Sequence, residues 1–527
     1  MFPAKIHRHI YLFALVSAPL GLLLGRFPGS LPVVILAGNW LLEGKFSEKW
    51  QRLKQTRLFF ALESLFIMYL VGSFYSSQTS AALDELRIAL PMVAFPVVIF
   101  SSAPIGKQEV KWTLWSLILG CVINTLWCSI YAFVLHHVEE VRNLSRFMSH
   151  IRLGMFVDMA IVASVYLYFE QANQILRWVY LCLVLYFLGM LVLLSLVSGL
   201  VLLLCVFAFA SVWYLLHQKK PILVTGILVM ATSVLVFLRM GMQLGKDQLQ
   251  ANETAYNALK KTNAKGRGYI CFDSLGMLEN GNYVFRNIQM EDLKRSWNAR
   301  VPEDTFSYAP AHNLHRYDVL LRYLSSASLP KDADGVKSLT TQDVAYIRAN
   351  VTNYNYPQWW FLHKRLYELI NEYASHKNNG DVNGHSFAMR WRFWQAAYRG
   401  ILEAPLFGVG LGDVQHTLNG IYQTHFPELD KKFYLKPHNQ FLSITLALGL
   451  LGLVVFLIML LYPVWFLRKQ LDWLYAGFFV VLLISFLTED TLGTQAGMGY
   501  YMSVNTLLLA AAYFKKQQIL VGSPGSH

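Results

Sequence analysis

The apolar residues of this chain fall into long blocks that contain few charges, and these blocks limit its fold more than any other feature. A helix needs about 20 mainly apolar residues to cross a bilayer. The blocks therefore predict an all-α polytopic membrane protein with about twelve transmembrane helices. The expected spans are residues 9–26, 28–43, 57–75, 87–103, 112–135, 152–170, 176–195, 198–216, 221–239, 438–467, 471–488 and 498–514.

The composition agrees with a membrane protein and excludes a soluble one. Of the 527 residues, 55% are hydrophobic and 15% are charged, which is too little charge to cover the surface of a soluble protein of this length. The formal net charge is +13, but much of the excess lies in short connections between the apolar blocks, where lysine and arginine set membrane topology. The charge therefore favours membrane lipids as partners and does not indicate nucleic-acid binding.

Positive charges gather in alternate connections between the expected spans. They follow the second, fourth, eighth, tenth and last spans, at residues 45–57, 107–111, 219–220, 468–469 and 515–516. The positive-inside rule places these connections and both termini in the cytoplasm, and the polar stretch 240–437 on the other side of the membrane. We therefore expect membrane helices in 1–239, a loop domain in 240–437, and membrane helices with a cytoplasmic tail in 438–527.

The long loop carries the patterns of a folded, mainly helical domain. Residues 279–282 are typical of a hairpin turn, and residues 314–324 and 342–349 have the periodicity of short amphipathic helices. Residues 332–335 resemble a calcium loop, but the third acidic position and the closing glutamate are missing, so we expect a surface turn there. The aromatic run 354–361 suits either the core of the loop or contact with lipid headgroups.

Arg390 is the first candidate for chemistry. In the helix expected before residue 405, it shares an apolar face with Phe387 and Trp394. A buried charge is costly without a partner, so Arg390 either forms a structural salt bridge or faces a ligand. The glycines of residues 405–412, which follow, suit a close backbone turn against the membrane face, since their spacing is wrong for a dinucleotide site.

His438 and Arg152 are expected at the same outer level of the membrane. Pro437 fits the first helical position, which puts His438 in the first turn of the tenth span. The positive end of the helix dipole disfavours an imidazolium there, so His438 is a candidate general base, and the alternative is a residue that only anchors the helix end. Arg152 and His150 open the sixth span, where the arginine either binds a ligand or anchors the helix.

Two arginines and a histidine at one level suit the capture of a pyrophosphate and the activation of a hydroxyl. Arginine binds phosphate oxygens through two parallel hydrogen bonds, and histidine can take the proton of an attacking hydroxyl. Glu489, near the outer end of the eleventh span, is placed to pair with one of the arginines. No aspartate-rich metal motif accompanies them, so we expect no metal ion and no other cofactor, with arginine in place of the usual divalent cation.

These residues resemble the O-antigen ligase and polymerase superfamily of bacterial inner-membrane glycosyltransferases. The resemblance lies in Arg390 four residues before Trp394, in the turn Pro405…Gly408-x-Gly410-x-Gly412, and in His438-Asn439 at the start of a span, followed by Gly449 and Gly452. The large loop after the ninth expected span is also similar to that of the ligase. Residues 250–380 match no such pattern.

The resemblance implies a GT-C-like membrane fold and the activity of an O-antigen ligase. Such an enzyme transfers a glycan from undecaprenyl pyrophosphate to a hydroxyl of the lipid A core at the periplasmic face, with inversion and without a metal ion. The resemblance further implies that His438 activates the acceptor and that Arg390 and Arg152 hold the donor pyrophosphate. The candidates for supporting contacts are Asn439, His150, Glu489 and Trp394.

Other functions fit the same pattern less well. An O-antigen polymerase uses the same donor but extends a second lipid-linked glycan, and a further relative glycosylates protein. A polysaccharide or lipid flippase would also have about twelve spans, but internal repeats and broken helices near the bilayer midplane are expected of it. The charged candidates of this chain instead lie at the outer boundary, so the sequence favours the ligase, a multi-pass protein of the bacterial inner membrane with a periplasmic active site.

Overall fold

The computed structural model divides the chain into two compact units. Unit 1 comprises Met1–Ile227 and Arg390–His527, and unit 2 comprises Leu228–Met389. Residues 240–437, expected as one loop, are thus shared between the two units. The structure describes residues 3–133, 145, 147–194, 196–218, 239, 241, 243, 245, 268, 270, 277–305, 314–359, 363–364, 366–371, 382–383 and 386–521.

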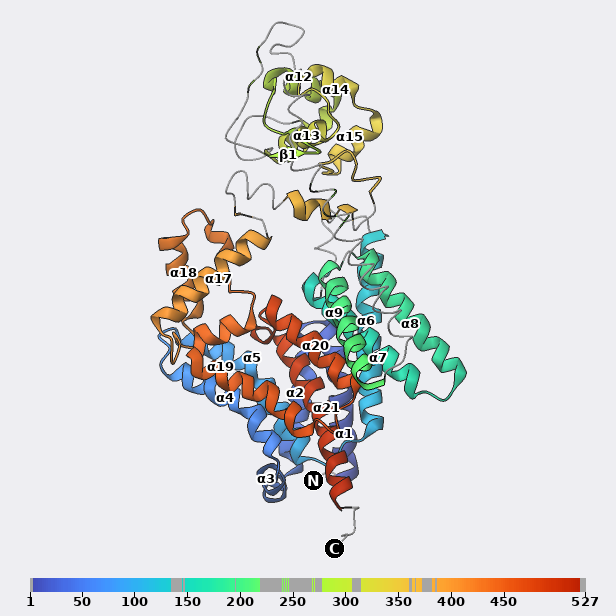
Figure 1. The fold of residues 1–527 in the computed structure, drawn as a ribbon, viewed down its shortest axis with the longest axis vertical. Coiled ribbons are helices and arrows are strands. Elements are labelled where there is room, and N and C mark those ends of the chain that lie inside the picture. Colours follow the sequence, from blue (N-terminus) through green and yellow to red (C-terminus); the bar gives the residue numbers. More distant parts are fainter. Residues whose placement is uncertain are drawn as a thin grey trace. The chain divides into compact units, whose positions relative to one another are not determined.

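Unit 1 is a bundle of α-helices (Figure 1). Its N-terminal helices are α1 (Ala4–Leu24), α2 (Arg26–Glu43), α3 (Phe46–Gln55), α4 (Arg57–Phe74), α5 (Thr79–Ser101), α6 (Lys107–Phe133), α7 (His150–Glu170), α8 (Gln174–Leu193) and α9 (Val197–Gln218). Its C-terminal elements are α17 (Ser386–Glu403), α18 (Val414–His425), η3 (Lys431–Phe433), α19 (Gln440–Leu467), α20 (Trp473–Thr488), η4 (Thr491–Gly493) and α21 (Gln495–Val521).

The structure confirms that the chain is mainly helical and carries helices able to cross a membrane. Every expected span apart from 221–239 coincides with a helix, and that segment lies outside the described residues except for residue 239. Among the described residues, 6 helices are long and apolar enough to cross a membrane, namely α1, α4, α6, α7, α8 and α19. The total of about twelve spans stays a prediction.

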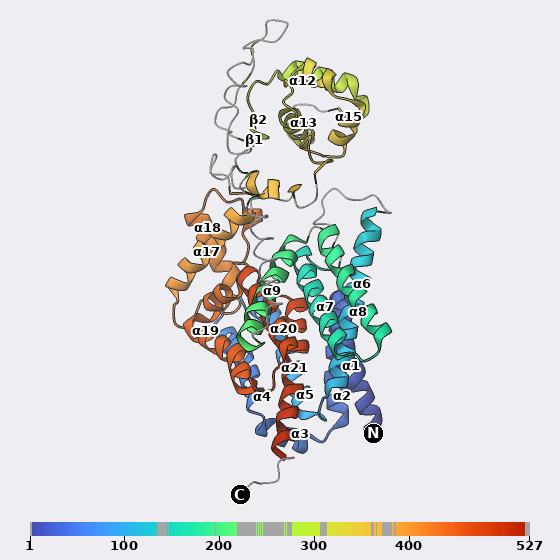
Figure 2. The ribbon, with the colours of Figure 1, turned by 45° about the vertical axis from the view of Figure 1, so that its right-hand side comes forward.

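Helix α7 lies at the centre of one half of the bundle, where α6, α8, α9 and α20 contact it (Figures 1 and 2). It is buried along almost its whole length because its sequence is apolar on all sides. Gly154 of α7 and Gly199 of α9 let two backbones approach closely, since a Cβ at Gly154 would lie 3.3 Å from the Cα of Gly199. Small residues commonly permit such contacts between helices in membranes.

Helix α19 is interrupted at Gly449, whose φ is 67°. The interruption frees backbone groups that must find partners, because an unpaired amide or carbonyl inside a membrane is costly. The segment 405–412 supplies these partners. Two of its amides donate to carbonyls of α19 at 2.9 and 3.0 Å, and the amide of Leu450 donates to the carbonyl of Pro405 at 2.9 Å.

Glycines permit this backbone contact, as the sequence led us to expect. Gly408 has a φ of 75°, which only glycine adopts readily, and a Cβ there would lie 2.4 Å from the carbonyl carbon of Ala447. The amide of Leu411 donates to the carbonyl of Gly72 at 3.1 Å, which joins the segment to α4 as well. The turn thus packs by its main chain against two helices of unit 1.

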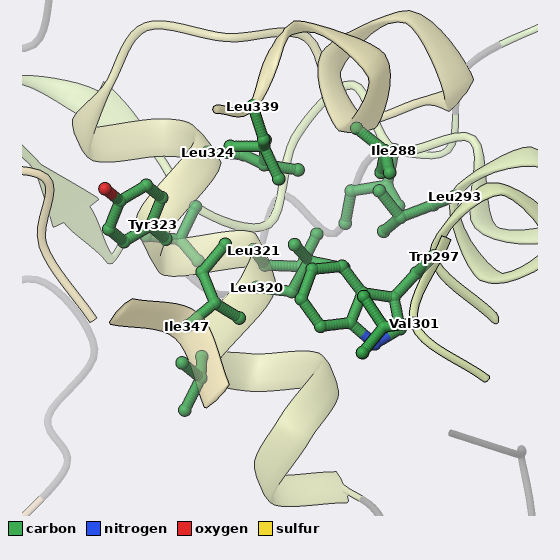
Figure 3. Packing of buried hydrophobic residues seen from close by; sticks show 13 residues of the cluster. Ile288, Leu293, Trp297, Val301, Leu320, Leu321, Tyr323, Leu324, Leu339 and Ile347 are labelled. Carbon is green, nitrogen blue, oxygen red and sulfur yellow. The ribbon is translucent and has the colours of Figure 1, made fainter. Parts of the chain in front are cut away.

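Unit 2 has its own hydrophobic core, formed mainly by helices (Figure 3). Its elements are β1 (Leu278–Glu279), β2 (Asn282–Tyr283), α12 (Met290–Arg300), η2 (Pro302–Asp304), α13 (Leu314–Ser326), α14 (Ala333–Ser338) and α15 (Thr341–Arg348). Leu320 and Leu324 of α13, Trp297 of α12 and Ile347 of α15 belong to one cluster, and all four side chains are fully buried. Each such side chain contributes about 1.5–3 kcal/mol by leaving water.

Most local expectations for the loop are confirmed in unit 2. Strands β1 and β2 form the hairpin, with Asn280 and Gly281 both at positive φ in its turn. Helices α13 and α15 cover the two predicted amphipathic segments. Asp332 caps α14 by accepting hydrogen bonds from two backbone amides, so this segment is a turn at a helix start. Tyr356 and Trp359 pack against a small apolar cluster and so belong to the core of the loop, whereas Tyr354 of the same run is exposed.

Unit 2 also buries a carboxylate together with its partners. Glu279 is fully buried, and its oxygens accept hydrogen bonds from Arg322 at 2.7 Å, Asn353 at 2.9 Å and Tyr367 at 3.0 Å. Burial alone would lower the pKa of Arg322, but the adjacent Glu279 raises it above its ordinary value. Arg322 therefore stays charged, and its bonds to Glu279 fix the hairpin to α13.

Candidate functional site

The predicted site residues come together within unit 1 from separate parts of the chain. Arg152 lies in the first turn of α7, Arg390 near the start of α17, and His438 just before α19. The turn after α20 carries Glu489, which joins two of them directly. The site is therefore formed by helix ends.

His438 lies before the tenth span and not within its first turn, which corrects the sequence prediction. Helix α19 begins at Gln440, and Asn439 is its N-cap residue, with a side-chain oxygen that accepts from the amide of Leu442 at 3.1 Å. Asparagine is strongly preferred at the N-cap position. The helix therefore starts after Asn439, and not at Pro437 as the proline had suggested. Asn439 thus has a structural role in ending the loop.

The backbone of His438 is held in an unusual conformation. Its φ is 51°, in the left-handed region that a residue with a side chain adopts at a cost of about 1–3 kcal/mol. Asp490 stabilises this conformation, because its Oδ2 accepts the amide N–H of His438 at 3.0 Å. Oδ1 of the same carboxylate accepts the hydroxyl of Ser443, one turn into α19. The left-handed backbone sets the direction in which the imidazole leaves the chain.

Glu489 forms a bridge between His438 and Arg390. Its Oε2 lies 3.2 Å from Nδ1 of His438, and its Oε1 accepts Nη2–H of Arg390 at 2.9 Å. Nη1 of Arg390 also donates to the carbonyl of Thr488 at 2.6 Å. The salt bridge that we considered for Arg390 therefore exists, and its partner is the carboxylate that also contacts the histidine.

The bridging carboxylate remains charged. Burial raises the pKa of Glu489, but the hydrogen bond from His438 and the charges of Arg390 and Arg152 together hold it below its ordinary value. A charged Glu489 favours the tautomer of His438 in which Nδ1 carries the proton. Nε2 then keeps its lone pair and can accept a proton from another group.

Arg152 is the cation of the site with the most open donors. Its Nε is buried and has no hydrogen-bond partner among the described residues. The carboxylates of Glu489 and Asp490 interact with it electrostatically, and no ion pair within 4.0 Å joins them in the described part of the chain. A buried N–H without a partner is costly, so this guanidinium is suited to receive an anionic group.

Other predicted residues support the loop that carries His438. Trp394 donates its Nε1–H to the carbonyl of Pro437 at 3.0 Å, which ties α17 to the residue before the histidine. Phe393, fully buried beside it, places its ring 5.9 Å from the imidazole. His150 begins α7 and is partly exposed, and its part in the site stays a prediction.

Asp490 is the residue of this site that we did not select from the sequence. Its signal was present, since it directly follows Glu489 at the end of an apolar helix, where acidic residues are uncommon. Its role depends on a contact with His438 across 52 positions of the chain, which no local pattern shows. The assembled group contains an oriented histidine, a carboxylate bridge and two arginines, which are groups suited to proton transfer beside a bound phosphate.

Comparison with known proteins finds a similarity over part of the chain. Residues 351–457 match a family model described as O-antigen ligase. The matched segment contains Arg390, Trp394 and His438, together with the glycine turn and the interruption of α19. No curated protein matches the chain. This chain therefore has helices able to cross a membrane and carries, over residues 351–457, a segment similar to the O-antigen ligase family.

Proposed function

We propose that this chain transfers a glycan from undecaprenyl pyrophosphate to a hydroxyl of the lipid A core, at the periplasmic face of a bacterial inner membrane. The observation that carries the proposal is the Glu489 carboxylate shared by His438 and Arg390, with the open guanidinium of Arg152 beside it. The family match supports the reaction class. The ends of apolar helices are where a lipid-linked pyrophosphate would meet the aqueous phase.

His438 acts as the general base in this proposal. Glu489 accepts a hydrogen bond from Nδ1–H of His438, so Nε2 keeps its lone pair and takes the proton of the acceptor hydroxyl. The hydroxyl oxygen forms its bond to the anomeric carbon as the bond from that carbon to the pyrophosphate oxygen breaks. Undecaprenyl pyrophosphate leaves with the electron pair of that bond, and attack from the opposite side inverts the configuration. A positioned general base accelerates such a reaction about 10²- to 10⁴-fold.

The two arginines stabilise the charge that develops on the leaving pyrophosphate. Arg152 offers its donors directly, whereas Arg390 already uses Nη1 and Nη2 on Thr488 and Glu489 and offers its remaining N–H groups. We therefore assign the larger share of donor binding to Arg152. Guanidinium groups take the place of a divalent cation in this proposal, so the reaction proceeds without a metal ion.

Substitution of the base and of one arginine tests the proposal. His438→Ala and Arg390→Ala should each lower glycan transfer by at least about 100-fold in purified protein supplied with the lipid-linked donor and the lipid A core. His425→Ala and Arg392→Ala are matched controls, since His425 ends α18 and Arg392 pairs with Glu428 at 3.1 Å. Full activity of His438→Ala would overturn the mechanism.

A second acceptor in the same assay decides between ligase and polymerase. The ligase proposal expects product with the lipid A core and none with a second lipid-linked glycan. The opposite result would assign the polymerase reaction to the same base and the same arginines. If His438→Ala makes neither product while His425→Ala still makes its product, the catalytic site is supported. Only the identity of the acceptor would then need revision.

A further inference from the structure

A polar cavity lies in unit 1 away from the His438 site. It has a volume of about 350 Å³ and is formed by the start of α1, the end of α2, helix α3 and the end of α5. The charged residues among its lining are Arg8, Glu43, Lys45, Glu48, Lys49 and Arg52. Neither the family match nor the proposed reaction assigns a role to it.

The cavity and the His438 site lie at opposite ends of helix α7. Arg152 is in the first turn of α7, whereas its last residue, Glu170, lies 3.5 Å from Lys111 near the start of α6. Arg8 of the cavity pairs with Glu109, also near the start of α6, at 3.1 Å. Helix α7 has 21 residues and is apolar enough to cross a membrane, which makes it about 30 Å long. The cavity is therefore expected at the other membrane surface, the one that the positive connections mark as cytoplasmic.

Two of the cations that line the cavity are already paired. Lys49 is buried, lies 2.9 Å from Glu43, and donates to the carbonyl of Trp40 at 2.7 Å. Arg8 contacts Glu109 and two backbone carbonyls. These bonds shape the wall of the cavity and leave little charge for a ligand.

Lys45 and Arg52 are the cations available to a ligand. Neither has a carboxylate within ion-pair distance in the described part of the chain. One N–H of Arg52 donates to the carbonyl of Ser101 at 3.2 Å, which orients the guanidinium and leaves its other donors open. Lys45 is exposed at the N-cap of α3, and Glu48 is the exposed carboxylate on the same rim. The available charge of the cavity is thus positive.

Helix α3 has the character of a helix that lies in the membrane surface. Its Lys49 and Leu53 are buried against the bundle, whereas Phe46 and Trp50, one turn apart, are 52% and 51% exposed. Exposed aromatic rings beside basic residues are typical of helices at the depth of lipid headgroups. The rim of the cavity is therefore at the level where phospholipid phosphates lie.

We propose that this cavity binds the phosphate of an anionic glycerophospholipid from the adjoining leaflet. Arg52 binds the phosphate oxygens through its open donors, and Lys45 adds a second positive charge. Phe46 and Trp50 pack among the lipid chains beside the headgroup. The site is independent of the glycan-transfer reaction, so it stands or fails separately from the function proposed above.

Lipid binding to the full-length protein tests the proposal. Native mass spectrometry of the detergent-purified protein, titrated with phosphatidylglycerol or phosphatidylcholine, should show one retained phosphatidylglycerol and no retained phosphatidylcholine. The double variant Lys45→Gln with Arg52→Gln should weaken phosphatidylglycerol binding about 30-fold, since each basic residue near an anionic surface contributes roughly fivefold. Arg57→Gln with Lys107→Gln removes the same charge from exposed positions outside the cavity and should leave the bound lipid in place.

Three outcomes would overturn the proposal. Equal losses in the two double variants would mean general attraction of the basic surface, and equal retention of phosphatidylcholine would mean that headgroup charge is not recognised. Inorganic phosphate that binds as tightly as phosphatidylglycerol would assign the cavity to a soluble anion. The altered side chains are exposed, and an unchanged thermal melting profile of each variant confirms that it is folded.

Discussion

Replacing Glu489 with glutamine keeps the size of the side chain but removes one of two acceptor oxygens that are both in use. Oε2 contacts Nδ1 of His438 at 3.2 Å, and Oε1 accepts from Arg390 at 2.9 Å. A glutamine has one oxygen and one NH₂ group, so it cannot accept from both partners. If the NH₂ group faces His438, Nδ1 must accept, the ring proton moves to Nε2, and the base is lost. If the NH₂ group faces Arg390, it meets the Nη2–H donor of that arginine, and the hydrogen bond between the two residues is lost.

The expected loss of rate follows from the role of the base. We expect Glu489→Gln to lower kcat about 10²- to 10⁴-fold, the range that a positioned general base contributes. Burial raises the pKa of Glu489, but His438, Arg390 and Arg152 hold it below its ordinary value. The contacts of the carboxylate are therefore fully present above its ordinary pKa of about 4.3 and are lost only as the pH falls through the lowered value. The defect of the variant should thus be constant across the neutral range.

Steady-state glycan transfer by the purified full-length protein measures this effect. Initial rates at varied donor and acceptor concentrations separate kcat from KM, and they are compared with those of Glu428→Gln. Glu428 pairs with Arg392 at 3.1 Å and has no contact with His438, so its substitution should leave kcat unchanged. An unaltered kcat in Glu489→Gln would refute the reasoning, and a raised donor KM alone would show that Glu489 serves only Arg390.

Three further substitutions test other parts of unit 1. Arg152→Lys keeps the charge but loses the planar fork, so the donor KM should rise about tenfold or more, and an unchanged donor KM in the same kinetic assay would contradict its role. Gly408→Ala adds a Cβ 2.4 Å from the backbone of α19 at a φ of 75°, so the free energy of unfolding in detergent should fall by at least about 2 kcal/mol. Gly420→Ala, where a Cβ meets nothing within 4 Å, is its control, and equal losses would argue against the backbone contact. Asp413 is buried, which raises its pKa, but hydrogen bonds from Ser77 and the next amide lower it below its ordinary value. Its stabilising effect is therefore present above its ordinary pKa of about 3.9 and lost as the pH falls through the lowered value, so Asp413→Asn should melt at a lower temperature at neutral pH and at a similar one in acid.

The sequence predicted the helices of unit 1 well because membrane insertion depends on local composition. About 20 apolar residues in a row are sufficient to identify a helix in lipid, where the backbone must satisfy its own hydrogen bonds. Arg390 and Glu489 were also recognisable, since a charge within an apolar stripe requires a partner. The division of residues 240–437 between two units was not predicted, because it depends on the return of residues 405–412 to α4 and α19.

The backbone conformation of His438 could not be predicted from the sequence around it. The cue from Pro437 placed the histidine inside a helix, whereas the competing N-cap preference of Asn439 starts the helix two residues after it. The positive φ of His438 depends on the carboxylate of Asp490, which a different helix brings into place. Local rules therefore identified the residue but not the direction of its side chain.

The backbone bonds between residues 405–412 and the interrupted α19 have an evolutionary consequence. Helix α17 carries Arg390 near its start. Main-chain atoms just after the end of this helix bond to α19, the helix that follows His438. Main-chain bonds do not depend on side-chain identity, except at glycines such as Gly408 and Gly449. We therefore expect relatives to vary freely in the sequence and length of residues 240–350, which precede the matched segment, since such divergence leaves the separation of the two site residues unchanged.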